Sequence, residues 1–511
     1  MTKRPRSNSG GRLIPPKNGA AIRMYRVGLG DCFLLAFDGV KADEPSYVLI
    51  DCGVHMAQGG GRATLRKAVD DIVRATGGRL NLVIATHEHT DHLSGFKHEA
   101  ERFINDLKID NLWLAWTEDD SDPVAKRLRR GRTAAKRAIA SALEKLRKEG
   151  AASRPALAAA ERLGFLASFD AEDEPDESAS RAALAQTLHL ERKATGNEIA
   201  LALLRDSAEA TYFFRPGHGP EKIPRAANAR AYILGPPLED ALLKKSDASS
   251  GRSKETYLTA AFATASFAAA VSELDPGDFE GLAAADLCFP FDARYRGPGN
   301  DAFCDARYRH AEPWRRIDTD WLGASEQLAL ALANHTNNTS LVVAFELGAP
   351  GAGPVLLFSA DAQVGSWLSW KNLKWGTRRS PVTVADLFAR TAVYKVGHHG
   401  SHNATLRQDA ERQPYGLELI GSRVVTLIPV DEGAATKLDW GMPHPRLYER
   451  LKLKSCGNVL RSDDGHDPSL RVPRRRAAGV PGVPNIRWNC SAETKDDNRP
   501  LYYDLQISAA E

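Results

Sequence analysis

Residues 86–92 read THEHTDH and directly follow the short apolar run LVIA. A run of this kind that ends in polar residues is typical of a buried strand, so these side chains would fan out on a loop at its carboxyl end. His87 and His89, two apart in an extended chain, can point the same way and share one ion. Asp91 and His92 lie on the turn beyond, where they can face a second ion, as two-metal hydrolases require. The pattern predicts a metal site, with a polar loop of chance histidines as the alternative.

Further motifs place glycine, aspartate, asparagine or histidine next to apolar stretches. Two precede the 86–92 segment and four lie far downstream. An ordered set of this size is more specific than any one of its members. The motifs read MYRVGLGDCFLL at 24–35, YVLIDCG at 47–53, NNTSLVV at 337–343, LLFSADA at 356–362, YKVGHHGS at 394–401 and PHP at 443–445.

The 86–92 segment resembles the metal-binding motif of the metallo-β-lactamase superfamily, and the flanking motifs are similar to those of its ComEC-like branch. The matches occur in the family's order and cover most of residues 20–120 and 335–465. The resemblance implies an α/β fold, the metallo-β-lactamase αββα sandwich of two mixed β-sheets flanked by helices, here with helical insertions. It also implies a metal-dependent hydrolase that holds zinc, as one ion or two, or manganese in its place.

Asp361 is the expected carboxylate that bridges two ions, because a carboxylate can span both and an imidazole cannot. It follows the apolar run at 355–358. His398 and His399 follow the run at 392–396, and both are candidate ligands of the second ion. Adjacent residues of an extended chain point to opposite sides, so only one is expected to ligate. His398 is slightly favoured, which leaves His399 for contact with the substrate or with a ligand.

Two further residues are expected beside the ligands rather than among them. Asp51 ends an apolar run, where its carboxylate would orient a ligand imidazole through the far ring N–H. A plain strand-end cap is the alternative. By the family resemblance His444, between two prolines, lies near the substrate, with a solvent-exposed histidine as the alternative. Asp91, Asp361 and His444 form the expected catalytic group.

One position departs from the family pattern. Many members supply a third histidine to the first ion just before the strand that precedes the bridging carboxylate, and this chain has Asn338 there. Asparagine is a poor ligand beside imidazole, so Asn338 is expected next to the ligands and the first metal position is expected to be weak. His218, in a Pro-Gly-His turn, resembles the missing element locally but lies too early in the chain. It is a secondary candidate ligand, with a surface histidine as the alternative.

At 511 residues the chain exceeds the usual size of a single core, so two domains or one domain with large insertions is expected. The motif map favours insertions. It predicts a disordered basic lead at 1–20, a hydrolase domain at 21–470 with insertions at about 120–195 and 237–332, and a basic, β-containing tail at 471–511. The net charge is only +3, from 68 basic and 65 acidic residues, so any binding of nucleic acid depends on a local patch.

Cysteine usage and hydropathy indicate the compartment. Six cysteines without paired CxxC spacing predict neither a disulfide scaffold nor a structural zinc ribbon. The N-terminus has no apolar signal-peptide core. The most apolar later stretch, 257–271, is dominated by alanine and is shorter than the ~20 residues that a membrane span requires. ComEC itself carries a membrane channel, so this chain is expected to be the hydrolase part alone, cytoplasmic and without a membrane partner.

Residues 123–150 have apolar side chains at helical spacing and basic side chains on the remaining faces, which predicts a basic amphipathic helix. Such a face is either simply solvated or a contact surface for phosphate groups. An acidic run at 170–177 is expected to be a flexible loop, and a further basic cluster lies at 474–476. The basic residues of the predicted helix are Lys126, Arg127, Arg129, Arg130, Arg132, Lys136 and Arg137.

The remaining apolar runs predict local structure around the motifs. Residues 23–37 are expected to form a strand pair at a sheet edge, and a helix is expected to begin near residue 94. A strand is predicted at 198–204. In the tail, 486–489 and 501–507 are expected to pair at a sheet edge.

The leading hypothesis is a hydrolase that uses a metal-activated water to cleave a phosphodiester, as a phosphodiesterase or nuclease on nucleic acid. The first alternative is a hydrolase of a small ester, such as a phosphorylcholine-type diester or a lactone, because the same branch resembles phosphorylcholine esterases. The second alternative is a binding or regulatory module in which the incomplete first metal position has lost turnover.

Overall fold

The computed structural model describes residues 11–55, 61–149, 163–164, 168, 195–246, 320–377, 380–422, 424–437, 440–463, 485–491 and 499–508. The chain divides into two compact units. The first consists of residues 1–122, 171–263 and 334–511, and the second of residues 123–170 and 264–333.

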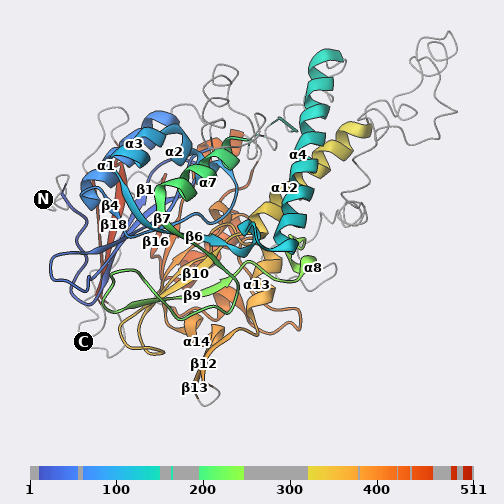
Figure 1. Ribbon diagram of the computed structural model, residues 1–511. Coiled ribbons are helices and arrows are strands. Elements are labelled where there is room, and N and C mark those ends of the chain that lie inside the picture. The colour runs from blue at the N-terminus through green and yellow to red at the C-terminus, as the bar shows by residue number, and fades with distance from the viewer. Residues whose placement is uncertain are drawn as a thin grey trace, which may run out of the picture. The chain divides into compact units, whose positions relative to one another are not determined.

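The first unit contains a mixed sheet of nine strands within the described residues (Figure 1). Its order is β17-β18-β1-β2-β3-β5-β6-β4, with β7 also paired to β6. Pairing is antiparallel from β17 to β3 and parallel from β3 onward. The strands are β1 (Ala20–Tyr25), β2 (Cys32–Phe37), β3 (Ser46–Cys52), β4 (Arg79–Leu80), β5 (Leu82–Ile84), β6 (Lys108–Ala115), β7 (Ala208–Phe214), β17 (Asn485–Cys490) and β18 (Tyr502–Ser508).

A second mixed sheet of the same unit has seven described strands in the order β16-β15-β14-β11-β10-β9-β8. Strands β11, β14, β15 and β16 run parallel, so their carboxyl ends lie at one rim of the sheet. These strands are β8 (Glu221–Lys222), β9 (Ala229–Gly235), β10 (Val342–Leu347), β11 (Val355–Phe358), β14 (Thr391–Lys395), β15 (Val425–Ile428) and β16 (Val459–Arg461); β12 (Lys374–Thr377) and β13 (Ser380–Thr383) form a separate hairpin.

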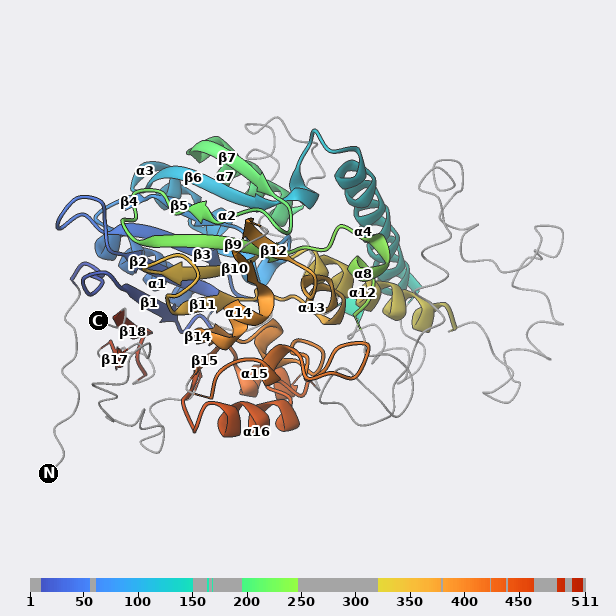
Figure 2. The ribbon, with the colours of Figure 1, turned by 90° about the horizontal axis from the view of Figure 1, so that it is seen from below.

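The two sheets of this unit pack face to face, and helices cover both outer faces (Figures 1 and 2). Strand β10 shows the alternation that this requires: Val343 and Phe345 join the core between the sheets, while Val342 and Ala344 join the core under the outer helices. One outer face is covered by α1 (Gly61–Thr76), α2 (Thr90–His98), α3 (Ala100–Asn105) and α7 (Gly196–Ser207), and the other by α13 (Val364–Trp370), α14 (Val384–Ala389) and α16 (Pro445–Lys454). The predicted αββα sandwich is therefore confirmed.

Short helices complete the first unit. They are α8 (Asp240–Leu243), α15 (Glu432–Lys437) and single 3-10 turns at Trp116–Glu118, His398–Gly400 and Gly416–Glu418. Among the helices of the described part, none combines the length and the apolar character that crossing a membrane requires.

The second unit contains α4 (Pro123–Glu149) and most of α12 (Asp320–Asn338), whose last turn belongs to the first unit. The helix predicted at 123–150 is thus present. The second unit has a small apolar core that contains Ile139, Leu163, Ala329 and Leu332.

Three local predictions were wrong. The segment at 198–204 is helical, because Thr195 and Glu198 form a reciprocal capping box that starts α7. Strands β1 and β2 are not at an edge, because β18 pairs with β1, and β17 then forms the outer strand. Helix α2 begins at Thr90 rather than near residue 94.

Several expected segments lie outside the described residues. They are the first ten residues of the predicted lead, the acidic run at 170–177, the alanine-rich stretch at 257–271 and the basic cluster at 474–476. Within the described part of the lead, Leu13 is buried and its backbone amide donates to the Ala75 carbonyl at 3.0 Å.

A buried charge network joins the C-terminal strand to the start of the chain. The Arg23 guanidinium is fully buried and donates to both carboxylate oxygens of Asp504, at 2.7 and 2.8 Å. It also donates to Asp71 at 2.5 Å, and the Tyr25 hydroxyl donates to the same oxygen. The Tyr502 ring lies 3.5 Å from the guanidinium. Strands β1 and β18 and helix α1 are therefore held by one fully paired cation.

Replacing Asp504 with Ala should destabilise the protein, because it leaves Arg23 buried with one carboxylate instead of two. Removing one partner of a buried ion pair costs about 3–5 kcal/mol, to be measured by urea unfolding. The control is Glu44→Ala, which removes an exposed ion pair with Lys41 and should change stability little. Equal effects of the two substitutions would contradict the assigned role of Asp504.

Candidate metal centre

The loop after β5 is fixed by a carboxylate from the neighbouring strand. Asp51, near the end of β3, accepts hydrogen bonds from the Thr86 amide at 2.8 Å and the Thr86 hydroxyl at 2.7 Å. Its other contact is His92 Nδ1 at 2.7 Å. Asp51 adopts a left-handed φ of 54°, which aspartate tolerates better than most residues. The structure therefore places Asp51 where it orients the His92 ring and leaves His92 Nε2 facing away from β3.

Four side chains meet in a closed ring at the rim of both sheets. His92 Nε2 lies 3.3 Å from Asp361 Oδ2 and 3.8 Å from Asp91 Oδ2. His399 Nε2 lies 3.0 Å from Asp91 Oδ2 and 3.9 Å from Asp361 Oδ2. All four side chains are at most 1% exposed, and their ligand atoms all lie within 4.8 Å of one another. We call these four residues the ligand ring.

The dimensions of the ligand ring fit a divalent cation. Tetrahedral zinc with bonds of ~2.0–2.1 Å places neighbouring ligand atoms about 3.3 Å apart, and the four separations of the ring bracket that value. Within the described residues, His92 Nε2 and Asp91 Oδ1 are buried without a hydrogen-bond partner. Buried polar atoms are normally paired, so these two atoms point to a ligand at this place.

Strand order explains why residues so far apart in sequence meet here. Asp91 and His92 follow β5 of the first sheet, and Asp361 and His399 follow the parallel strands β11 and β14 of the second sheet. Polar side chains at the carboxyl ends of these strands therefore gather at one rim. This arrangement follows the general rule for ligand sites in sheets with parallel strands.

The two adjacent histidines after β14 are separated by a tight turn. His398 and His399 both have left-handed φ angles, 41° and 51°, so the chain is not extended there. His399 Nδ1 donates to the Pro429 carbonyl at 2.7 Å, which leaves Nε2 as its ligand atom. The His398 ring instead lies 3.4 Å from the side-chain amides of Asn337 and Gln363, and its backbone amide donates to Asp361 Oδ1 at 3.1 Å. The structure brings His399 into the ligand ring and leaves the His398 ring outside it.

Charge pairing sets the protonation of the ligand ring. Burial alone would lower the pKa of His92, but the carboxylates of Asp361, Asp91 and Asp51 raise it well above its usual value. The pKa of His399 is raised in the same way, against burial, by Asp361 and Asp91. Burial alone would raise the pKa of Asp91, but His92 and His399 lower it below its usual range. In the protein without metal, the carboxylates therefore favour the protonated form of both imidazoles.

The remaining histidines of the 86–92 segment form a buried pair. His87 Nε2 lies 3.1 Å from His89 Nδ1, and both side chains are buried. Burial, followed by the neighbouring His92 and His89 rings, lowers the pKa of His87 well below its usual value. The His87 and His92 ring centroids are 4.1 Å apart, so the pair lies directly beside the ligand ring.

Asn338 and His218 do not reach the ligand ring. Asn338 is fully buried; its side chain donates to the Lys245 carbonyl and accepts from the Gln363 amide, so it joins α12 to the segment after Asp361. His218 lies exposed in the turn between β7 and β8, where its carbonyl accepts a hydrogen bond from Trp375.

His444 is tied to the turn that carries His399. It is half-buried at the start of α16, its backbone amide donates to the Gly400 carbonyl at 2.8 Å, and its ring centroid lies 6.3 Å from that of His402. Burial, followed by the charges of His402 and Arg446, lowers the pKa of His444. Its imidazole is therefore neutral at neutral pH.

One residue of the site, Lys395, was missed from the sequence, and a second, Asp31, was expected from the sequence to be structural rather than catalytic. Lys395, the last residue of β14, is 1% exposed and its ammonium lies 2.5 Å from Asp31 Oδ2 and 3.4 Å from Asp361 Oδ1. Asp31 in turn lies 3.8 Å from His92 Nδ1. The available signal was a lysine at the end of an otherwise apolar strand, directly before the two histidines. Lysine is almost never fully buried unless it is paired, so this position pointed to a carboxylate partner.

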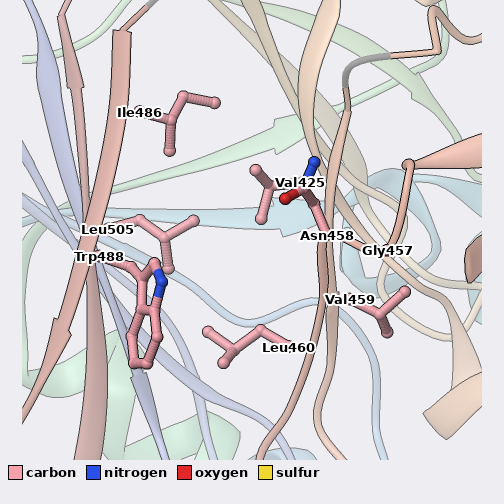
Figure 3. A pocket seen from close by; sticks show the side chains of 8 residues that line it. All are labelled: Val425, Gly457, Asn458, Val459, Leu460, Ile486, Trp488 and Leu505. Carbon is pink, nitrogen blue, oxygen red and sulfur yellow. The ribbon is translucent and has the colours of Figure 1, made fainter. Parts of the chain in front are cut away.

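An apolar crevice lies elsewhere in the first unit, between the ends of the two sheets (Figure 3). Ile486, Trp488 and Leu505 face Val425 and Leu460 across it. None of its lining residues is titratable, so it is not a candidate catalytic site.

Comparison with known proteins agrees with this site. Residues 26–158, which include the 86–92 segment, match the model of the metallo-beta-lactamase superfamily. This part of the chain is therefore similar to a metallo-beta-lactamase superfamily domain. Members of the superfamily are mostly hydrolases and typically bind divalent metals, which agrees with the buried ligand ring.

A solved structure is also similar, that of a beta-lactamase domain protein from Burkholderia ambifaria, with 14% identity and a TM-score of 0.21. The match covers 45% of this chain and 49% of the solved chain, so it spans about half of that protein. No curated protein matches the chain.

The placement of the two neighbouring histidines gives a direct test. His399→Gln should weaken zinc binding by at least about tenfold, because it removes a ligand atom, while His398→Gln should retain zinc. Equilibrium dialysis followed by elemental analysis measures both variants against the wild type. If His398→Gln loses the metal and His399→Gln keeps it, the ligand ring is assigned to the wrong residue.

The raised pKa values of His92 and His399 predict a pH dependence of metal binding. Because both pKa values are raised, protons compete with a cation for the two Nε2 atoms more strongly than they do at an ordinary imidazole. Binding should therefore release protons, and affinity should rise with pH until the raised pKa values are passed. Calorimetry in buffers of different ionisation enthalpy counts the protons. Metal binding without proton release would contradict the raised pKa values.

Proposed function

We propose that the protein is a metal-dependent hydrolase that cleaves phosphodiester bonds in nucleic acid. The observation that carries the hydrolase assignment is the ligand ring, in which two imidazoles and two carboxylates are buried together at spacings that suit one divalent cation. A cation bound there supplies Lewis-acid activation of a water molecule and of a phosphoryl oxygen.

The protein's own residues have separate tasks in this proposal. Asp91, His92, Asp361 and His399 hold the cation, and Asp51 fixes the ring of His92 through Nδ1. Because these groups are buried, their charges act through a medium of low dielectric and are weakly screened by water.

His444 is assigned to the substrate. Its backbone is fixed to the turn that carries His399, and its neutral imidazole can accept a proton at neutral pH. A neutral imidazole beside a phosphodiester can take a proton from the attacking water, and the imidazolium that forms can return that proton to the leaving oxygen.

Two observations favour a nucleic acid as the substrate. Helix α4 carries exposed basic side chains, among them Lys126, Arg127 and Arg130, and a polyanion binds such a surface by releasing counterions. The motifs around the ligand ring also resemble the ComEC-like branch of the superfamily. A small ester would need no contact with α4. Substitutions in this helix therefore distinguish a nucleic-acid substrate from a small ester.

The test replaces Lys126, Arg127 and Arg130 together with Gln, which removes charge and keeps good helix propensity. Affinity for single-stranded DNA, duplex DNA and RNA should fall, and the salt dependence should flatten by roughly one unit per lost phosphate contact. Turnover of bis-p-nitrophenyl phosphate should be unchanged. The matched control replaces Lys17, Lys222 and Lys374, which are exposed on the first unit, and should leave binding unaffected.

Hydrolysis itself is measured with the metal-loaded wild type, and Asp361→Asn serves as the inactive control. Cleavage of nucleic acid by the wild type alone supports the proposal. If the wild type cleaves bis-p-nitrophenyl phosphate but no nucleic acid, the substrate is a small ester. If neither is cleaved by the loaded protein, the hydrolase assignment is wrong.

A further inference from the structure

Lys395 occupies a position that is costly for a lysine. Its side chain is 1% exposed, and its ammonium contacts three oxygens: Asp31 Oδ2 at 2.5 Å, the Ala360 carbonyl at 2.9 Å and Asp361 Oδ1 at 3.4 Å. Removing an ammonium group from water is energetically unfavourable unless charged partners and hydrogen bonds compensate. The three oxygens provide that compensation, and each belongs to the ligand ring's immediate surroundings.

The two oxygens of the Asp361 carboxylate have different partners. Oδ1 is contacted by the Lys395 ammonium and accepts from the His398 backbone amide at 3.1 Å. Oδ2 is the oxygen that faces the imidazoles of His92 and His399, at 3.3 and 3.9 Å. Lys395 and the His398 amide thus lie on one side of the carboxylate, and the imidazoles lie on the other.

Lys395 also holds Asp31 beside His92. Asp31 Oδ2 is bound by the ammonium, and Asp31, Asp51 and His92 place ligand-type atoms within 4.8 Å of one another. Without the ammonium, the Asp31 carboxylate would be buried next to Asp51 and near Asp361 with no lysine to offset it. Lys395 therefore fixes two carboxylates at once, from the turn before β2 and the turn after β11.

We propose that Lys395 is a positioning residue for the metal centre: its ammonium holds Asp361 by Oδ1, so that the carboxylate presents Oδ2 to the cation. The inference rests on the proposed function, since it concerns the same ligand ring. It goes beyond that function because it assigns a role to a residue that is not a ligand.

A positioning role and a purely electrostatic role of Lys395 predict opposite changes in metal affinity when the lysine is removed. Removal of a nearby positive charge would, by Coulomb's law alone, strengthen the binding of a cation. Loss of a group that orients a ligand weakens binding, typically by 10–100-fold for residues that support metal ligands. The sign of the change in affinity therefore identifies the role of Lys395.

The experiment measures the affinity of the full chain for Zn²⁺ by competition with a chromogenic chelator, in the wild type and in Lys395→Met. We expect affinity to fall by about 10–100-fold. Co²⁺ serves as a second probe, because its visible absorption reports the arrangement of ligands; the Lys395→Met spectrum should differ from that of the wild type. The control is Lys371→Met, which removes a lysine that pairs with Asp409 and Glu411. It should leave affinity and spectrum unchanged.

A double variant guards against misfolding, which would follow if Lys395→Met left Asp31 buried and uncompensated. Lys395→Met with Asp31→Asn removes that excess charge, and circular dichroism and thermal unfolding verify the fold. Weak Zn²⁺ binding that persists in the folded double variant supports the positioning role. Wild-type affinity in the double variant, or unchanged or tighter binding in Lys395→Met, overturns it. Failure of the wild type to bind Zn²⁺ or Co²⁺ would instead refute the proposed function on which the inference rests.

Discussion

The burial of carboxylates at one rim of the two sheets is the constraint on which this structure depends. Asp31, Asp51, Asp91 and Asp361 are each at most 2% exposed and lie around the same point. Like charges this close repel strongly in a low-dielectric interior, so the fold must supply positive charge among them. The Lys395 ammonium supplies it, and the carboxylates favour the protonated forms of the two imidazoles of the ligand ring. A divalent cation bound there would take the place of those protons.

The sandwich architecture is what brings these groups together. Each sheet contributes parallel strands whose carboxyl ends lie at the same rim, and the apolar core between the sheets holds those ends in place. Ligands that are hundreds of residues apart in the sequence meet at this rim because the strands that precede them end there. The Arg23 network stabilises the first sheet, because it holds the C-terminal strand β18 against β1.

Much of the fold and part of the site could be predicted from local sequence. The apolar runs before residues 87 and 361 correctly predicted strands that end in polar residues. The two strands of the tail were also predicted from short strand-like runs. The segment at 198–204 was misread because its leucines and alanines suit a strand or a helix, and the capping box of Thr195 and Glu198 decides between them. Which of His398 and His399 faces the ligand ring could not be read from the sequence, because it depends on two successive left-handed φ angles. The position of Lys395 at the end of an apolar strand pointed to a carboxylate partner, but that this partner is Asp31 depends on long-range pairing.

The most direct measurement is an anomalous-diffraction map from crystals of the protein grown with Zn²⁺ or Mn²⁺. We expect an anomalous peak within coordinating distance of Asp91, His92, Asp361 and His399, with Lys395 still bound to Asp31. A map without a peak at the ligand ring from metal-saturated crystals, or with a peak held by other side chains only, would contradict it.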